Sequence, residues 1–312
     1  MTNKNSIISA SILALALLCG NARAEHPSMT HVVSPRIPGN VTFADDKINL
    51  DRCDMYERFD RELTSMAFTH GTTLLTLKRA NRYFPILIPI LKANGVPEDL
   101  IYLACIESSL NTRALSGSGA AGLWQFMPAT GKEYGLEVND YVDERYHPEK
   151  STEAACRYLK NAYRKYGNWE STAASYNAGM GRISRELDSQ GAESAYDLFL
   201  NDQTSRYIFR LLAMKSILEH PNYFGYTVDA SQFYYPIATV DEEVSEPVED
   251  WQTWAADHGT NYLTLRELNP WIRAKSLPNK SGKTYIVKLP AKDAMLRSKQ
   301  DKKIYNHNWI AK

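Results

Sequence analysis

Apolar residues recur at helical spacing along most of the chain, and this pattern restricts the fold more than any other feature of the sequence. From Phe59 onward, aliphatic and aromatic residues follow one another at three- and four-residue intervals, in segments that Gly71, Pro85 and Pro89 interrupt. Pro97 begins a further helix at its first turn, where the missing N–H costs no hydrogen bond. We therefore predict a mainly α-helical domain, with helices over 97–110, 148–166, 169–177 and 205–219.

The helical pattern stops near residue 222, and a different organisation follows. Two short helical patterns between Trp251 and Leu268, then a strand ahead of Pro290, predict a small α+β (βααβ) module. The stretch before it has two prolines and an acidic cluster, which is typical of a linker. The expected domains are a signal peptide over 1–24, an extension with a helix over 25–75, the helical domain over 76–222, the linker over 223–248, the small module over 249–291 and a basic tail over 292–312.

The N-terminus has the pattern of an export signal. Lys4 precedes an apolar run from Ile7 to Leu18, and Ala22-Arg23-Ala24 places small residues where a signal peptidase cleaves. We therefore expect an exported protein of the periplasm or cell envelope, whose mature chain begins near Glu25. Cys19 leaves a lipid-anchored alternative open, although the preceding leucine does not fit the small residue normal before a lipidated cysteine. No later segment has the roughly 20 apolar residues of a membrane span, so any membrane association would be peripheral or through a lipid.

Charge and cysteine content exclude several other classes of protein. The chain has 36 basic and 36 acidic residues, and this balance predicts no surface for nucleic acid. The basic residues from Arg297 to Lys312 are expected to form a solvated tail. Cys53, Cys105 and Cys156 remain after the leader, and their spacing fits neither a disulfide framework nor a zinc site. A single bridge between two of them stays open. We expect a monomer that needs no metal and no cofactor.

One carboxyl group lies on an apolar helix face. Glu107 follows Leu103 by four residues and precedes Leu110 by three, so helical geometry stacks the three side chains. Burial among leucines disfavours the charged form of a carboxyl group and raises its pKa. A general acid for glycosidic cleavage needs this property, because it must keep its proton near neutral pH. The alternative is a glutamate at the rim of the stripe that pairs with an arginine.

Two further segments add groups that suit sugar binding. The segment from Ser116 to Pro128 is rich in small residues, and its glycines allow the backbone to approach a ligand closely. Within it Gln125 offers both a donor and an acceptor, whereas Trp124 could either stack on a sugar ring or belong to the core. Further on, Ser175-Tyr-Asn-Ala-Gly179 places a phenol and an amide beside a helix-ending glycine.

In this order, the motifs resemble those of the lytic transglycosylases with a goose-lysozyme-like SLT catalytic domain. The family pattern is Glu-Ser, Gly-Leu-x-Gln-x-x-Pro, Ala-Tyr-Asn-x-Gly and Glu-Thr-x-x-Tyr-Val. The resemblance spans about 91–218 and is strongest to the membrane-bound transglycosylase D type, which carries LysM modules after the catalytic domain. The corresponding segments here are Glu107-Ser108, Gly122-Leu-Trp-Gln125-Phe-Met-Pro128, Ser175-Tyr-Asn-Ala-Gly179 and Gln203-Thr-Ser-Arg-Tyr207-Ile208.

The resemblance implies cleavage of peptidoglycan glycan strands by a single carboxyl group. Glu107 would protonate the oxygen between N-acetylmuramic acid and N-acetylglucosamine and then deprotonate the muramyl C6 hydroxyl, which closes a 1,6-anhydro ring. Ordinary glycosidases need two carboxyl groups. Here Glu133 and Asp140 are available but lie in a polar stretch beyond the loop.

The resemblance also assigns roles to the other motif residues. Ser116 would contact the substrate or intermediate, and Gln125 and Met127 would line the sugar cleft. Tyr176 would hold Glu107 through a phenol hydrogen bond, and Asn177 would support the cleft. Core packing is the alternative for Met127, Tyr176 and Tyr207. The supporting residues would be Ser108, Gln203 and Tyr207.

The chain departs from the family pattern at two motif positions and in the small module. Ser175 replaces alanine, and Gln203 replaces a glutamate that helps to order the hydrogen bonds of the site in the family. The module from Trp251 to Leu289 resembles a degenerate LysM domain without the usual Gly-Asp-Thr opening. Two alternatives to the transglycosylase therefore stay open: a hydrolytic muramidase on the same fold, and a non-catalytic peptidoglycan-binding or scaffold protein.

Overall fold

The computed structural model describes residues 33–310. The predicted signal peptide over 1–24 and the lipidation alternative at Cys19 therefore lie outside the described residues. Within the described range, no helix is both long and apolar enough to cross a membrane.

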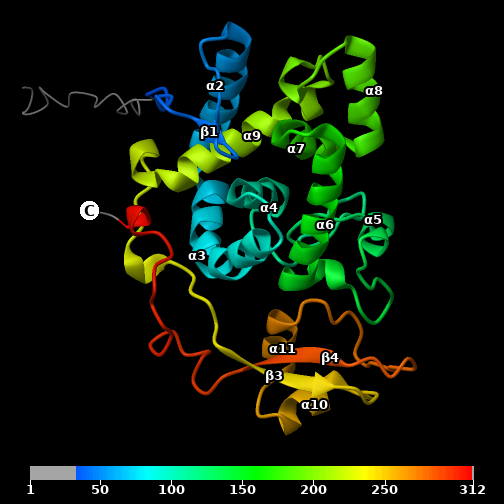
Figure 1. The fold of residues 1–312 in the computed structure, drawn as a ribbon. Coiled ribbons are helices and arrows are strands. Elements are labelled where there is room, and N and C mark those ends of the chain that lie inside the picture. The colour runs from blue at the N-terminus through cyan, green and yellow to red at the C-terminus, as the bar shows by residue number, and fades with distance from the viewer. Residues whose placement is uncertain (1–32, 311–312) are drawn as a thin grey trace, which may run out of the picture. The chain divides into compact units, whose positions relative to one another are not determined.

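The larger part of the described chain is helical, which confirms the mainly α-helical prediction (Figure 1). A two-residue hairpin precedes the first of these helices. The strands and helices of this part are β1 (Thr42–Phe43), β2 (Asp46–Lys47), α2 (Cys53–Phe68), α3 (His70–Ala93), α4 (Ile101–Ser108), α5 (Pro128–Glu133), α6 (Pro148–Tyr166), α7 (Trp169–Ala178), α8 (Met180–Gln190) and α9 (Asp202–Glu219). Short 3₁₀ helices lie at η1 (Glu98–Leu100), η2 (Glu144–Tyr146), η3 (Ala195–Asp197), η4 (Pro221–Phe224) and η5 (Ala230–Gln232).

Helix α9 lies at the centre of this domain. It packs against α2, α4 and α7, and nearly every residue from Tyr207 to Leu218 is buried. A helix that is buried on all sides belongs to the core rather than to the surface. The side chain of Asn201 accepts a hydrogen bond from the backbone N–H of Thr204, which satisfies one of the free donors at the start of the helix. The capped start of α9 thus fixes where Tyr207 enters the core.

Helix α3 runs without a break through Pro85 and Pro89, where the sequence predicted interruptions. Both prolines are exposed, whereas Phe84, Leu87 and Ile88 are buried. A proline inside a helix removes one backbone hydrogen bond and costs about 3 kcal/mol. Here both proline rings lie on the exposed side of the helix, and the buried apolar side chains next to them keep the helix on the core.

The small module has the predicted βααβ order, with β3 (Thr239–Val244), α10 (Trp251–Asp257), α11 (Tyr262–Leu268) and β4 (Tyr285–Pro290). Strands β3 and β4 pair antiparallel from Thr239 opposite Pro290 to Val244 opposite Tyr285 (Figure 1). The module has its own core, around Trp251, Leu265 and Val287. Strand β3 lies within 223–248, the stretch expected to be a linker. Its residues are exposed except for Thr239 and Val244, so the segment lacks the apolar alternation that announces a strand.

The last residues differ from the expected solvated tail. After the small module the chain returns to the helical domain and ends in η6 (His307–Trp309). Trp309 is only 1% exposed, and its ring packs against Phe84 and Phe233. The indole Nε1 donates a hydrogen bond to the carbonyl oxygen of Leu218, at 2.5 Å. The sequence did not predict the burial of Trp309, because a charged stretch with a single tryptophan has no apolar periodicity.

We expect Trp309→Ala to destabilise the protein by about 3 kcal/mol or more, because it leaves a cavity in the core and an unbound carbonyl at Leu218. Thermal unfolding of the purified protein measures the effect as a lower melting temperature. Phe199 is 90% exposed and serves as the aromatic control, so Phe199→Ala should melt with the wild type. Equal melting temperatures for the two variants would show that the tail is not part of the fold.

Candidate active site

Glu107 lies in the last turn of α4, a short helix inside the domain. Leu100, Leu103 and Leu110 are fully buried around it, and the Glu107 side chain itself is half-buried. Burial raises the pKa of Glu107 above its usual value, and two weaker influences oppose the rise: a hydrogen bond from Tyr207 and the positive charge of Arg210. The buried setting inferred from the helix pattern is thus present. The predicted helix over 97–110 is shorter, however: α4 ends at Ser108, and Leu110, with a φ of 55°, does not continue its helical face. The carboxyl group holds its proton to a higher pH than an exposed glutamate does.

The phenol that contacts Glu107 belongs to Tyr207 of α9. Its hydroxyl donates a hydrogen bond to Glu107 Oε1 at 2.5 Å, and the ring is buried. The pKa of Tyr207 is raised well above its usual value by burial and by the nearby charge of Glu107, so Tyr207 keeps its proton and acts as the donor. Core packing, the alternative for Tyr207, therefore describes its ring only. Its hydroxyl faces the carboxyl group of Glu107.

Tyr176 differs from the expectation for its hydrogen bond. Its hydroxyl donates to the carbonyl oxygen of Trp124 at 2.8 Å, not to Glu107. Burial raises the pKa of Tyr176, and the charge of Glu107 raises it further, so the two side chains lie within electrostatic reach. Tyr176 also packs edge-on against Tyr158 and Phe126. It supports the loop beside Glu107 rather than the carboxyl group directly.

The small-residue loop after α4 folds back on itself. Its backbone hydrogen bonds join Gly122 N to Ala114 O at 2.9 Å, and Ala121 N to Phe126 O at 3.0 Å. Gly122 has a φ of 77°, and a Cβ atom at this position would lie 1.9 Å from the carbonyl oxygen of Arg145. The close approach predicted for the glycines of this loop is therefore to the protein backbone at Gly122.

A buried ion pair holds the same loop from the other side. Arg145 and Asp143 are both nearly buried, and Arg145 Nη2 donates to Asp143 Oδ2 at 2.7 Å. Nη1 of the arginine donates to the carbonyl oxygens of Gly119, at 2.8 Å, and Phe126, at 2.9 Å. The sequence analysis did not identify Arg145, because it stands in a polar stretch that resembles a surface turn. Its charge is satisfied by the loop that it organises.

The structure places the loop residues in distinct positions. Gln125 has a φ of 49°, and its Nε2 donates to Gly122 O at 2.9 Å, which leaves the side-chain carbonyl as the group free to accept from a ligand. Met127 is 42% exposed. Ser116 Oγ accepts a hydrogen bond from Ala120 N at 2.9 Å. Ser108 Oγ donates to Leu123 O at 2.9 Å and thereby ties the end of α4 to the loop.

Trp124 belongs to the core and is not available for stacking on a sugar. Its side chain has no exposed surface, and its Nε1 donates to Thr152 Oγ1 at 2.8 Å. The two alternatives left by the sequence for this tryptophan are thus resolved in favour of packing.

Asn177 and Gln203 lie apart from the hydrogen bonds of Glu107. Asn177 Oδ1 accepts from Thr204 Oγ1 at 3.4 Å, which links α7 to the first turn of α9. Gln203 is exposed in that turn and makes no hydrogen bond with another candidate residue within the described chain. Arg210, one turn after Tyr207, was not identified from the sequence, although its spacing of three residues from that tyrosine was visible.

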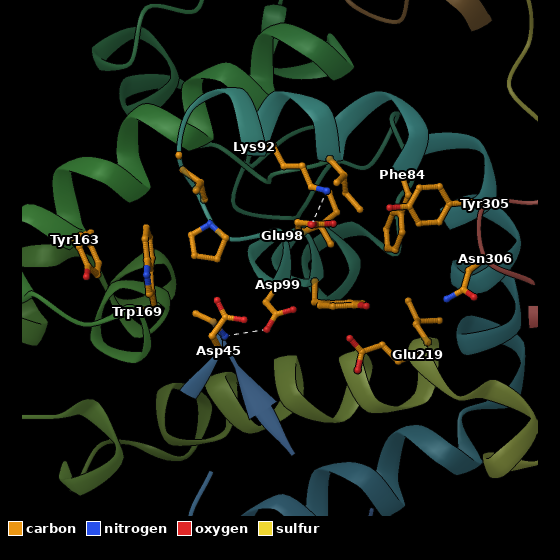
Figure 2. A pocket seen from close by; sticks show the side chains of 18 of the residues that line it. Asp45, Phe84, Lys92, Glu98, Asp99, Tyr163, Trp169, Glu219, Tyr305 and Asn306 are labelled. Atoms are coloured by element: carbon orange, nitrogen blue, oxygen red, sulfur yellow. Dashed lines mark hydrogen bonds and ion pairs between the residues drawn. The ribbon is translucent and has the colours of Figure 1, made fainter. Parts of the chain in front are cut away.

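A cavity of about 830 Å³ lies elsewhere in the helical domain (Figure 2). Its polar lining includes Asp45, Glu98, Asp99 and Glu219, and Lys92 pairs with Glu98 at 2.6 Å. None of the residues that line it is a candidate predicted from the sequence. It is therefore separate from the Glu107 site.

The arrangement of the acidic, histidine and cysteine side chains in residues 33–310 bears on metal binding and on cysteine chemistry. No cluster of three or more His, Cys, Asp or Glu side chains in this range could hold a metal ion. Cys105 and Cys156 are buried free thiols, and burial raises the pKa of Cys156 to about 12. Cys53 is free and exposed.

Two known domains match the chain. The transglycosylase SLT domain matches residues 86–199, and the soluble lytic transglycosylase C-terminal LysM-like domain matches residues 241–293. The chain therefore contains a transglycosylase SLT domain, followed by a LysM-like domain.

Among named relatives, the membrane-bound lytic murein transglycosylase D of Escherichia coli is 29% identical over 244 residues, which are 76% of this chain and 52% of that protein. The chain thus spans about half the length of this relative. The peptidoglycan transglycosylase of phage T7 is 40% identical over 94 residues, 29% of this chain and 7% of that protein. Among solved structures, the 70 kDa soluble lytic transglycosylase of Escherichia coli is 24% identical, with a TM-score of 0.39 over 45% of this chain and 24% of that chain.

We expect Glu107→Gln to stabilise the protein near neutral pH. The folded protein has a higher Glu107 pKa than the unfolded chain, so the folded state binds more protons between the two values, and stability falls as pH rises through that window. Glutamine removes this loss and still accepts the hydrogen bond from Tyr207. The melting temperature measured from pH 4 to pH 8 should show a gain for the variant that disappears at the acid end.

Glu193→Gln is the control for that pH series, because Glu193 is exposed. It should show no gain that depends on pH. A Glu107→Gln protein that melts below the wild type at pH 8 would contradict the raised pKa of Glu107 in the folded protein.

We expect Gly122→Ala to disrupt the loop, because the added Cβ atom overlaps the carbonyl oxygen of Arg145. The change should destabilise the protein by about 2 kcal/mol or more, measured as a lower melting temperature. A Cβ atom at Gly117 would meet no other atom of the described chain within 4 Å, and the φ of Gly117 is not positive. Gly117→Ala is therefore the matched control and should melt with the wild type. Similar results for the two alanine variants would contradict the packing of the loop on Arg145.

Proposed function

We propose that this protein cleaves the β-1,4 bond between N-acetylmuramic acid and N-acetylglucosamine in peptidoglycan and leaves 1,6-anhydro-muramyl ends. Glu107 is the sole acid and base. The observation that carries the proposal is the buried Glu107 carboxyl group with its raised pKa, bound by Tyr207 and set beside the small-residue loop. The match to the transglycosylase SLT domain over residues 86–199 supports the substrate class.

In the first step the protonated Glu107 carboxyl transfers its proton to the bridging oxygen, and the glycosidic bond breaks. The resulting carboxylate is stabilised by the Tyr207 hydrogen bond and by the charge of Arg210. In the second step this carboxylate takes the proton of the muramyl C6 hydroxyl. The oxygen of that hydroxyl attacks the anomeric carbon and closes the 1,6-anhydro ring. Glu107 thus ends the cycle protonated, and no water is consumed.

The surroundings of Glu107 favour a mechanism with one carboxyl group. The charged side chain that acts on its pKa, within the described residues, is Arg210, a cation. Retaining and inverting glycosidases place a second carboxylate about 5 to 10 Å from the acid, where its negative charge would raise the pKa of the acid further. An internal hydroxyl nucleophile removes the need for this second group.

The loop residues are proposed to contact the glycan. Gln125 offers its side-chain carbonyl, Met127 an exposed apolar surface and Ser116 a hydroxyl that lies next to the hydroxyl of Ser118. Asn177 and Ser108 act indirectly, through α9 and the loop respectively. Tyr176 positions the loop through Trp124.

The protein is further proposed to act as an exported monomer in the periplasm or cell envelope. The LysM-like domain is consistent with binding to peptidoglycan. Association with the membrane, peripheral or through a lipid on Cys19, is part of the same proposal.

Digestion of purified cell wall followed by mass spectrometry tests the proposed reaction. The wild type should release muropeptides that are one water lighter than hydrolysis products. Glu107→Gln should reduce the release at least about 100-fold, because it removes the proton donor. Glu133→Gln, in the exposed part of α5, is the matched control and should keep wild-type activity.

Products with the mass of hydrolysed muropeptides would instead identify a muramidase on this fold. Wall degradation that persists in Glu107→Gln would remove the catalytic assignment, and absence of degradation by the wild type would favour a non-catalytic peptidoglycan-binding protein.

A further inference from the structure

A second cavity, of about 450 Å³, lies where the loop after α4 meets the LysM-like module. We call it the arginine groove. Three guanidinium groups line it against a single carboxylate, so its lining carries a net positive charge of two. Its residues are Arg113, Leu115, Tyr146, Tyr262, Leu263, Arg266, Glu267, Pro270 and Arg273.

Aromatic rings and backbone groups hold the arginines of the groove in place. Arg273 lies over the ring of Tyr146, with 4.1 Å from Cζ to the ring centroid, and its Nη1 donates to Pro270 O at 3.2 Å. Arg266 lies over the ring of Tyr262, and its Nη1 donates to the Tyr262 hydroxyl at 2.5 Å. Guanidinium groups fixed in this way lose little conformational entropy when they bind an anion.

Arg266 also has an unsatisfied donor. Its Nε atom is buried and has no hydrogen-bond partner in the described part of the protein. An unpaired buried donor is costly, and a charged donor more so. Arg113, by contrast, pairs with Glu267. Arg266 and Arg273 are therefore the two groove arginines without a carboxylate partner among the residues described.

The groove is continuous with the loop of the candidate active site. Leu115 lines the groove and forms a β-bridge with Ala121, while Ala114 O accepts hydrogen bonds from Gly122 N and Gln125 Nε2. Arg113 follows Glu107 by six residues, a separation of at most about 20 Å even for an extended chain. Hydrogen bonds from Asn111 N to Ser108 O and from Ala114 N to Asn111 O turn the chain and shorten it.

The groove combines its charge with apolar surface. Leu115 is 63% exposed and Leu263 is 68% exposed, one on each side. A ligand that matches this lining has aliphatic groups and free carboxylates and lies close to a sugar bound at Gln125. The peptide stem attached to the muramyl residue of peptidoglycan has this chemistry.

We propose that the arginine groove is a subsite for the anionic peptide stem of the glycan strand, with Arg266 and Arg273 binding its carboxylates. The inference rests on the proposed function, because it needs the glycan at the Glu107 site. It gives the LysM-like module a direct part in substrate selection, through α11 and the turn that follows it.

Binding to soluble glycan strands tests the groove without turnover. Full-length protein with Glu107→Gln is titrated with peptide-bearing strands and with enzymatically stripped, peptide-free strands, by calorimetry at low and moderate salt. The Glu107→Gln protein should prefer the peptide-bearing strands. Adding Arg266→Gln and Arg273→Gln together should reduce the ratio of the two affinities about tenfold, and the reduction should be smaller at moderate salt.

Two control proteins keep the result specific. Lys280→Gln removes one positive charge from an exposed position of the module outside the groove and should leave the ratio as it is. Arg266→Lys keeps the positive charge but loses the forked donors of the guanidinium group. Its affinity ratio should lie between those of the Glu107→Gln protein and the double arginine variant. Melting temperatures of all variants confirm that they fold.

An affinity ratio that stays the same in the double arginine variant, or an equal loss for both kinds of strand, would overturn the groove proposal. The mass of the wall digestion products tests the chemistry at Glu107 separately. Failure of the proposed reaction and failure of the groove therefore give different results.

Discussion

The contact between α4 and α9 sets the protonation of Glu107, and the rest of the site is organised around it. Burial among leucines favours the neutral carboxyl group, whereas the Tyr207 hydroxyl and the Arg210 charge favour the carboxylate. The two influences oppose each other at one carboxyl group, so the group can hold a proton and later give it up. Because Tyr207 and Arg210 both stand on α9, the position of that single helix controls both stabilising contacts.

The loop beside Glu107 is rigid for a reason that lies outside the loop itself. Small residues alone would leave a flexible segment, but the Asp143–Arg145 pair binds two of its carbonyl groups, and Gly122 fits against the backbone of Arg145. Ser108 and Tyr176 add bonds to Leu123 and Trp124. The proposed glycan would bind a loop that is already ordered, so ordering of the loop on binding would not lower the affinity.

Local patterns in the sequence predicted most of the helices, the βααβ module and the buried setting of Glu107. They did not predict the partner of Glu107, because Tyr176 and Tyr207 are both aromatic positions in helices, and only tertiary packing decides which hydroxyl reaches the carboxyl group. Arg145 was missed for a similar reason: its partners Gly119 and Phe126 lie more than 15 residues away along the chain. The continuation of α3 through Pro85 and Pro89 likewise depends on which side faces water. Strand β3 gave no signal, because its pairing comes from β4 and not from an apolar face of its own.

The burial of Trp309 changes how the small module is connected. The chain leaves the helical domain after Tyr235 and forms β3 through β4. It rejoins the helical core at Ile304 and at Trp309, which stacks on Phe233. The module is therefore an insertion attached to the helical domain at both ends, and not a domain attached through a single linker. The two connecting segments meet where Trp309 stacks on Phe233, and together they restrict the volume that the module can sample. They therefore keep the effective concentration of the module at the surface of the helical domain high. If only one of the two connecting segments were lengthened, the other would still limit how far the module could move.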